Sequence, residues 1–258
     1  MRRLIAVALA SGLIVVAGVA IVAVDSRSPS HDNVVQPAPD PNQNSIVPIV
    51  DTTPVAGGAS PVITRIPATQ WKQIVATGTW RPGCPVGRKD LRSLTIGYID
   101  FTGKAQRGTI IAHRDSVDDL STIFTDLYQA RFPVARMEPV ENYGGDVLRS
   151  LRANNTSAFN CRKPGQINAP VSDSPHANGR AIDINPVQNP WRDPRCKCWE
   201  PRAKFAKVKS GPGVIRQGTL PVRLFQEQGW IWQNIKVADY MHFDTGYPSR
   251  PRNGNNVG

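Results

Sequence analysis

The chain has 258 residues, which is enough for one large domain or two small ones. Apolar residues make up 40% and charged residues 20%, a balance that excludes wholesale disorder and permits a hydrophobic core. The net charge of +11 indicates an acidic partner without identifying it, and four cysteines are too few for a fold built mainly on disulfides.

The chain begins with the pattern of an export segment. Arg2 and Arg3 precede an uncharged, mostly apolar run of 21 residues, Leu4 to Val24. A cleaved signal has an apolar region of about 7–15 residues, whereas a membrane span needs about 20. The length therefore favours a retained N-terminal anchor over a cleaved signal peptide within residues 1–24. Either reading places the rest of the chain outside the cytoplasm, membrane-anchored or secreted.

Residues 25–65 are predicted to form a Pro-rich linker. Seven prolines and no aromatic residue fall between positions 26 and 65, so this stretch cannot bury enough apolar surface to offset its chain entropy. Acidic and basic residues balance over positions 1–65, so the whole +11 belongs to residues 66–258. We expect this basic domain to meet an anionic cell wall or membrane surface, with a merely solvated basic face as the alternative.

Residues 66–250 show no internal repeat and are predicted to form one domain. Apolar residues alternate over 94–98, residues 100–104 read as a turn, and 108–113 as the returning strand of a hairpin. Ser116 is a plausible N-cap for a helix through Leu127 that stops by Pro133.

A second helix is expected from Pro221 to Gln228, ended by Gly229. Strands mixed with helices, without regular alternation, indicate an α+β fold: a single domain with a central antiparallel sheet and flanking helices. Residues 251–258 are expected to be a flexible tail.

Two segments carry chemistry. The first runs Ser174-Pro-His-Ala-Asn-Gly-Arg-Ala-Ile-Asp-Ile-Asn-Pro186, and the second runs Ala238-Asp-Tyr-Met-His-Phe-Asp244. A hydrolytic zinc site needs three protein ligands, an open position for water, and a carboxylate off the metal to accept a proton. Imidazole and carboxylate side chains suit it, and the domain contains three histidines: His113, His176 and His242.

A strand over 180–185 would point Ala181 and Asp183 the same way and leave room beside the carboxylate for a metal. Gly179 would let the chain turn between His176 and that strand. Asp239 lies three residues before His242, so a tight turn would bring its carboxylate near the metal. A lone histidine is more often structural than a ligand, and we interpret His113 that way.

Together these positions resemble the M15 family of zinc D,D-peptidases. The family marks are Ser-x-His-x-x-Gly-x-Ala-x-Asp and a carboxylate three residues before a second histidine. The segments Asn154–Arg162 and Gly229–Trp232 also resemble the family's bacterial members. The match covers about residues 80–246. It implies the D,D-peptidase fold, which hedgehog-type signalling domains share, and an activity on peptidoglycan peptides.

The resemblance also implies the roles of individual residues. His176, Asp183 and His242 would bind Zn²⁺, and Asp239 would be the general base. Arg162 would bind and polarise the substrate, and Ser174 would contact it. Two positions depart from the family: Gln233 stands where glycine is usual, and Asp173 stands where an aromatic residue is usual.

The cysteines fit an oxidising compartment. Cys84 and Cys161 match a pair seen in similar chains, so the resemblance implies a Cys84–Cys161 disulfide beside Arg162. Cys196 and Cys198 would then pair across one residue or remain thiols. Trp230 and Trp232 are interpreted as core residues rather than walls of a cleft.

The implied function is zinc-dependent hydrolysis of peptidoglycan stem peptides, most like a D-Ala-D-Ala carboxypeptidase. An L-Ala-D-Glu endopeptidase with the same site residues is one alternative. A non-catalytic, zinc-containing wall-binding module is another, against which the presence of Asp239 argues. Nucleic acid is not expected as a partner of an exported chain, and we expect a monomer.

Overall fold

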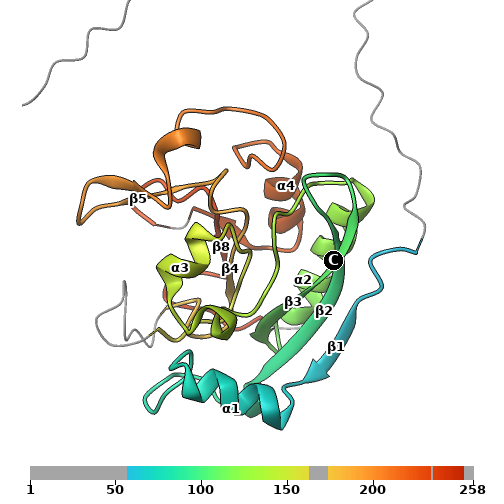
Figure 1. Ribbon diagram of the computed structural model, residues 1–258, viewed down its shortest axis with the longest axis vertical. Coiled ribbons are helices and arrows are strands. Elements are labelled where there is room, and N and C mark those ends of the chain that lie inside the picture. The colour runs from blue at the N-terminus through green and yellow to red at the C-terminus, as the bar shows by residue number, and fades with distance from the viewer. Residues whose placement is uncertain (1–56, 163–173, 234, 253–258) are drawn as a thin grey trace, which may run out of the picture. The chain divides into compact units, whose positions relative to one another are not determined.

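The computed structural model describes residues 57–162, 174–233 and 235–252. It divides the chain into residues 1–49 and 50–258, and all described residues belong to the second unit. Figure 1 shows the course of that unit from β1 to β8. None of the helices in the described ranges is long and apolar enough to cross a membrane. The predicted anchor, residues 1–24, lies outside those ranges.

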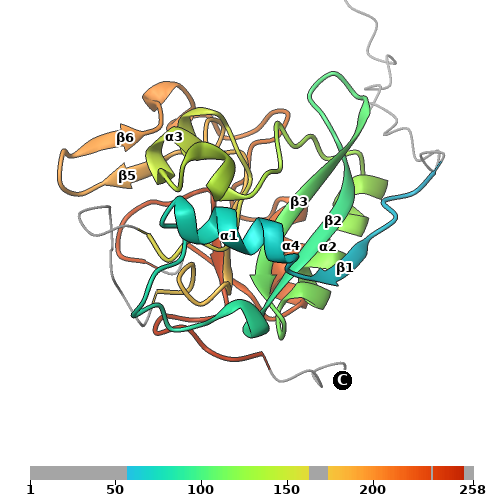
Figure 2. The same ribbon diagram turned by 60° about the horizontal axis from the view of Figure 1, so that its bottom comes forward.

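The first sheet is antiparallel, in the order β1 (Val62–Arg65), β2 (Leu91–Ile99) and β3 (Ala105–His113). β2 and β3 form the predicted hairpin, whose turn is stabilised by hydrogen bonds to the Asp100 carboxylate from the backbone N–H groups of Thr102 and Lys104. Helix α2 (Val117–Gln129) lies against this sheet, as both views show (Figure 2). Its apolar stripe, Leu120, Ile123, Phe124 and Leu127, packs on Leu94, Ile96, Ile110 and Ala112.

The second sheet is also antiparallel, in the order β4 (Ala181–Asp183), β8 (His242–Asp244) and β7 (Ile231–Trp232). Ile182 and Phe243 lie on its core face, and the Phe243 ring stacks on Phe225 of α4 (Leu220–Glu227), 4.0 Å between centroids. These residues belong to the same hydrophobic cluster as α2, so one core joins the two sheets.

A third element is the short hairpin of β5 (Trp191–Asp193) and β6 (Cys198–Glu200). The remaining helices are α1 (Ala68–Ala76) and α3 (Val147–Arg152), with 3₁₀ turns at Arg88–Asp90, Val140–Tyr143 and Ala203–Phe205. Cys84 and Cys161 form the disulfide that the family resemblance implies, and Cys196 pairs with Cys198 across the β5–β6 turn.

The structure corrects three predictions. Residues 62–65 do not belong to the predicted linker, because β1 pairs with β2 in register from Val62–Thr95 to Arg65–Arg92 and Ala59 is buried. The predicted flexible tail begins too early, because Arg252 donates hydrogen bonds to Asp115 and Asp119. The predicted central sheet is two three-stranded sheets that share a core.

Candidate active site

Two possible metal ligands lie side by side on adjacent strands of the second sheet. Asp183 on β4 and His242 on β8 are paired residues of the antiparallel ladder, so their side chains lie on the same face. Ala181 lies opposite Asp244 on that face. The small residue of the motif therefore leaves room for Asp244, whereas the sequence analysis expected it to leave room for a metal.

His176 reaches the same point from a turn over residues 175–179. Gly179 ends that turn with a φ of +68°, and a Cβ at this position would lie 2.7 Å from the backbone nitrogen of His113. The motif glycine is thus needed both for its positive φ and for close packing against β3. The His113 N–H donates to the Gly179 carbonyl at 2.8 Å, which fixes the turn on the first sheet.

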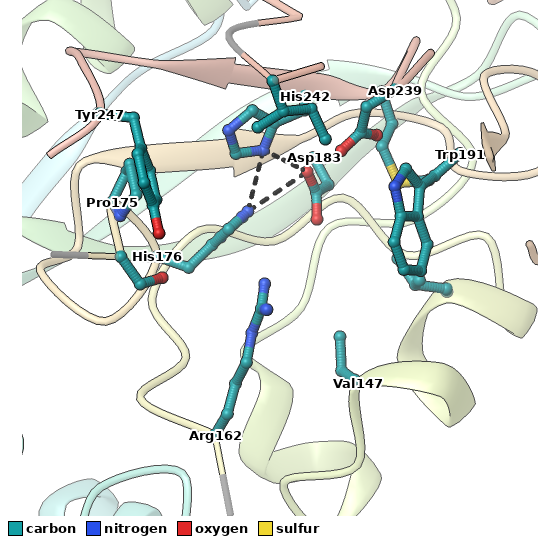
Figure 3. A pocket seen from close by; sticks show the side chains of 13 residues that line it. Val147, Arg162, Pro175, His176, Asp183, Trp191, Asp239, His242 and Tyr247 are labelled. Carbon is teal, nitrogen blue, oxygen red and sulfur yellow. Dashed lines mark hydrogen bonds and ion pairs between the residues drawn. The ribbon is translucent and has the colours of Figure 1, made fainter. Parts of the chain in front are cut away.

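The three donor atoms form a small triangle (Figure 3). His176 Nε2 and His242 Nδ1 are 3.1 Å apart, and they lie 3.3 Å and 3.1 Å from Asp183 Oδ1. All three residues are buried, and they form a group that could hold a metal ion. The structure thus brings together the three residues that the motif singled out.

The second nitrogen of each imidazole, His176 Nδ1 and His242 Nε2, has its own hydrogen-bond partner outside the triangle. His176 Nδ1 lies 2.7 Å from the Ala158 carbonyl oxygen, and His242 Nε2 lies 3.0 Å from Asp244 Oδ2. The Ala158 carbonyl can accept only an N–H, so Nε2 of His176 keeps its lone pair for a metal. Asp244 is fully buried and accepts the Gly246 N–H at 2.7 Å.

The triangle fits zinc. Ligand atoms about 2.0–2.1 Å from a tetrahedral zinc ion are separated by about 3.3–3.4 Å, and the observed separations are 3.1–3.3 Å. Two imidazoles and one carboxylate are also a donor set of catalytic zinc sites, which keep the fourth position open. The described residues therefore fit the implied ion in both donor type and spacing.

Burial and close ionisable neighbours shift the pKa values of Asp183 and His242 in this cluster. Burial alone would raise the pKa of Asp183, but the two histidines outweigh it and lower the pKa. Burial alone would lower the pKa of His242, but hydrogen bonds to Asp183 and Asp244 outweigh it and raise the pKa to about 10. These partners thus favour the protonated form of the His242 imidazole.

Asp239 lies beside this triangle, on the loop before β8 (Figure 3). Its backbone N–H donates to Gln233 Oε1 at 3.2 Å, and it forms an isolated β-bridge with Trp191. The Oδ1 atom is buried and has no hydrogen-bond partner among the described residues. Burial raises the pKa of this carboxyl above its usual range, with Asp183 adding to the effect and His242 and Arg162 opposing it.

Arg162 points into the pocket from the opposite side, toward the histidines (Figure 3). It is 8% exposed, and burial lowers the pKa of its guanidinium. Its backbone has a φ of +62° and is held by Asn160 Oδ1, which accepts its N–H at 2.7 Å, and by Arg81, which donates to its carbonyl at 3.0 Å. The Cys84–Cys161 disulfide anchors the residue before it.

The rest of the pocket is mainly apolar. Ser174, the predicted substrate contact, is buried and lines it, and the Ala177 N–H lies 3.4 Å from its hydroxyl. Pro175 and Met241, inside the two motif segments, also line it. Five further lining residues come from α3, β5 and the C-terminal loops and were not predicted: Val147, Leu151, Trp191, Ile235 and Tyr247. No local pattern marks them, because the tertiary fold alone brings them together.

Three further residues lie outside the pocket, as expected. His113 bonds to Asp115 at 2.6 Å and contacts the Arg180 guanidinium. Trp230 is buried in the core and donates to Asp119 at 2.9 Å. Trp232 packs against the same core and donates to the Tyr240 carbonyl. The structural interpretation of all three is confirmed.

The structure explains one departure from the family pattern, Gln233 at a position where glycine is usual. Gln233 has a φ of +55°, in the left-handed region that favours glycine, which explains why glycine suits this position. Here the side chain also accepts the Asp239 N–H. The other departure, Asp173, lies outside the described residues.

The comparisons with known proteins agree with the motifs. Residues 168–245 match the family described as D-alanyl-D-alanine carboxypeptidase, peptidase family M15. This range contains the three donors, Asp239 and Ser174, whereas Arg162 precedes it. No curated protein and no solved structure matches the chain.

Proposed function

Residues 168–245 place the chain among the M15 peptidases, and from this premise we propose that it is a zinc-dependent D-Ala-D-Ala carboxypeptidase of peptidoglycan stem peptides. The observation that carries the proposal is the meeting of three groups at one pocket: the donor triangle, the Asp239 carboxylate and the Arg162 guanidinium. A zinc ion bound by His176, Asp183 and His242 would supply Lewis acidity toward water and the scissile carbonyl.

Asp239 supplies the base. Its Oδ1 is buried, unpaired among the described residues and beside the donors, yet a three-ligand zinc site is complete without it. A carboxylate in this position can accept a proton from the attacking water and return it to the leaving amine. The hydrogen bond to Gln233 and the β-bridge with Trp191 hold the backbone of Asp239 beside the three proposed ligands.

Arg162 supplies positive charge opposite the base. Its planar guanidinium can hold a carbonyl oxygen or a terminal carboxylate in a fixed geometry, which suits a substrate that ends in D-alanine. Donors aimed at the developing oxyanion contribute about 3–4 kcal/mol each in acyl-transfer enzymes. The apolar wall around Trp191 and Met241 suits a small apolar side chain of the substrate.

Mass spectrometry of peptidoglycan digested by the purified full chain tests this function. We expect release of terminal D-alanine that depends on zinc and is absent with Asp239→Asn. Fragments cut between L-Ala and D-Glu would instead establish the endopeptidase alternative. A zinc-loaded protein that yields neither product would establish the non-catalytic wall-binding module.

A further inference from the structure

A second pocket lies away from the active site and is lined almost entirely by cations. We call it the basic hollow; its residues are Arg65, Ile66, Arg88, Lys89, Arg92 and Arg114. None of the six lines the active-site pocket. Ile66 is the one apolar residue among these six and is 1% exposed, whereas four of the five cationic residues are exposed.

The fold brings these charges together from four segments. Arg65 ends β1, Arg88 and Lys89 belong to the 3₁₀ turn before β2, Arg92 is the second residue of β2, and Arg114 follows β3. Arg65 and Arg92 are directly paired residues of the β1–β2 ladder. Like charges in such a pair destabilise a sheet, so this arrangement has a cost that a bound anion would offset.

Two of the guanidinium groups are held in place by backbone carbonyls. Arg88 Nε donates to the Ile66 carbonyl at 3.0 Å, and Arg92 Nη1 donates to the carbonyls of Leu91 at 2.9 Å and Lys89 at 3.0 Å. A guanidinium has five N–H donors, so each group keeps others for a ligand. Binding an anion would therefore cost these side chains little further entropy.

No carboxylate in the described ranges neutralises the cluster. Two acidic residues adjoin the five cations in sequence. Asp90 accepts the Gly87 N–H at 3.0 Å, and Asp115 pairs with Arg180 at 2.7 Å. Elsewhere in the described structure arginines do pair with carboxylates, for example Arg180 with Asp115 and Arg252 with Asp119. The basic hollow is thus one pocket lined by five positive charges that form no ion pair among the described residues.

We propose that the basic hollow binds the phosphate groups of a phosphodiester-linked anionic polymer. The guanidinium group of arginine can donate two hydrogen bonds to two oxygens of one phosphate, and five cations around one hollow suit an anion with several acceptor oxygens. The concave shape favours a polymer chain over a flat membrane surface. Arg114 directly follows His113, which supports the motif turn at Gly179, so the two sites are connected through β3. The polymer would hold the domain on the wall while the active site works.

The test measures binding of poly(glycerol phosphate) oligomers to the full chain by calorimetry at low and at physiological salt. The variant Arg65→Gln/Arg114→Gln removes two exposed charges of the hollow. The matched control, Lys207→Gln/Lys209→Gln, removes two exposed charges elsewhere. Each double variant lowers the net charge from +11 to +9.

We expect the hollow variant to bind the oligomers at least tenfold more weakly and with a smaller salt dependence, while the control stays within about twofold of the parent. Poly-L-glutamate of equal charge should bind more weakly than the phosphodiester. Equal losses in both variants would mean that only general charge matters and would overturn the proposal. Tighter binding to anionic phospholipid vesicles than to the oligomers, lost in the hollow variant, would reassign the hollow to a membrane surface.

Discussion

Asp244 lies outside the pocket but contacts His242, one of the three residues of the proposed metal site. It is fully buried, bonds to His242 Nε2 at 3.0 Å and is itself held by the Gly246 N–H. Such partners orient a ligand imidazole and raise its basicity, and their loss costs about 10–100-fold in metal affinity. Its position behind His242, outside the pocket, also makes it a poor substitute for Asp239 as base.

The first prediction compares metal content at this position. Asp244→Asn should weaken zinc binding by about 10–100-fold, and His176→Ala should abolish stoichiometric binding, because a ligand is lost. Asp193→Asn, at a buried carboxylate that pairs with Arg195 outside the pocket, is the control and should keep about one zinc per chain. Full zinc content in His176→Ala by elemental analysis would contradict the ligand assignment.

The second prediction concerns pH. Since the pKa of His242 is raised to about 10 in the metal-free protein, its imidazole is protonated at pH 7.5 and must lose that proton to become a ligand. Calorimetry in buffers of different ionisation enthalpy should therefore show release of about one proton per zinc bound. Zinc affinity should rise with pH between about 7 and 10. Binding without proton release would show that His242 is already neutral.

At the scale of elements, the strongest periodic patterns could be predicted and the weakest could not. The β2–β3 hairpin, α2 and α4 were each marked by alternation, helical spacing or end signals. β1 was not, because all four of its residues are exposed and it follows a Pro-rich stretch. α1 buries only Ile74 of its nine residues and has no side-chain cap, so nothing in its sequence distinguishes it.

In the candidate active site, too, residues within a recognisable motif could be predicted, whereas contacts between distant segments could not. The resemblance to the M15 motifs pointed to His176, Asp183 and His242, which lie in two short, recognisable segments. The Ala158 carbonyl and the Trp191 bridge to Asp239 depend on which backbones lie side by side. These contacts join segments that are far apart in the chain, and no pattern in a single sequence predicts them.

A third prediction tests the loop that carries Asp239. Gln233→Gly and Gln233→Ala both remove the hydrogen bond to the Asp239 N–H, a loss of about 0.5–1.5 kcal/mol, so kcat should fall by about 2–10-fold in each. The alanine variant loses this bond and keeps the strained φ of +55°, so its Tm should fall. The Tm of the glycine variant should fall less, because glycine accepts that φ without strain. Wild-type kcat in the glycine variant would show that Gln233 does not position the base.

At the scale of the whole molecule, one hydrophobic cluster joins the first sheet and α2 to the second sheet, which carries Asp183 and His242. Ile182 and Phe243 anchor the second sheet in the cluster that α2 and the first sheet also form. The Cys84–Cys161 bridge joins the region before β2 to the segment that ends at Arg162, across 77 residues. Both disulfides, and the match of residues 168–245 to a peptidase family, suit an extracytoplasmic location.

The fourth prediction concerns the N-terminal region, for which the sequence predicts an anchor and a linker. The full chain should fractionate with membranes, and limited proteolysis should release the domain by cutting between positions 26 and about 58. The upper bound follows from β1, since Ala59 is buried and Val62 begins the strand. A mature N-terminus near residue 21 or 24, found by mass spectrometry, would show a secreted protein instead.

The central claim is that Asp239 is the base and the three donors alone hold the metal. Asp239→Asn keeps the size of the side chain but cannot accept a proton, and general bases contribute about 100–10,000-fold. We therefore predict that kcat for D-alanine release falls by at least about 100-fold while zinc content and Tm remain those of the parent. Near-normal kcat with zinc bound would contradict the assignment of the base, and loss of zinc would show that Asp239 is part of the metal site.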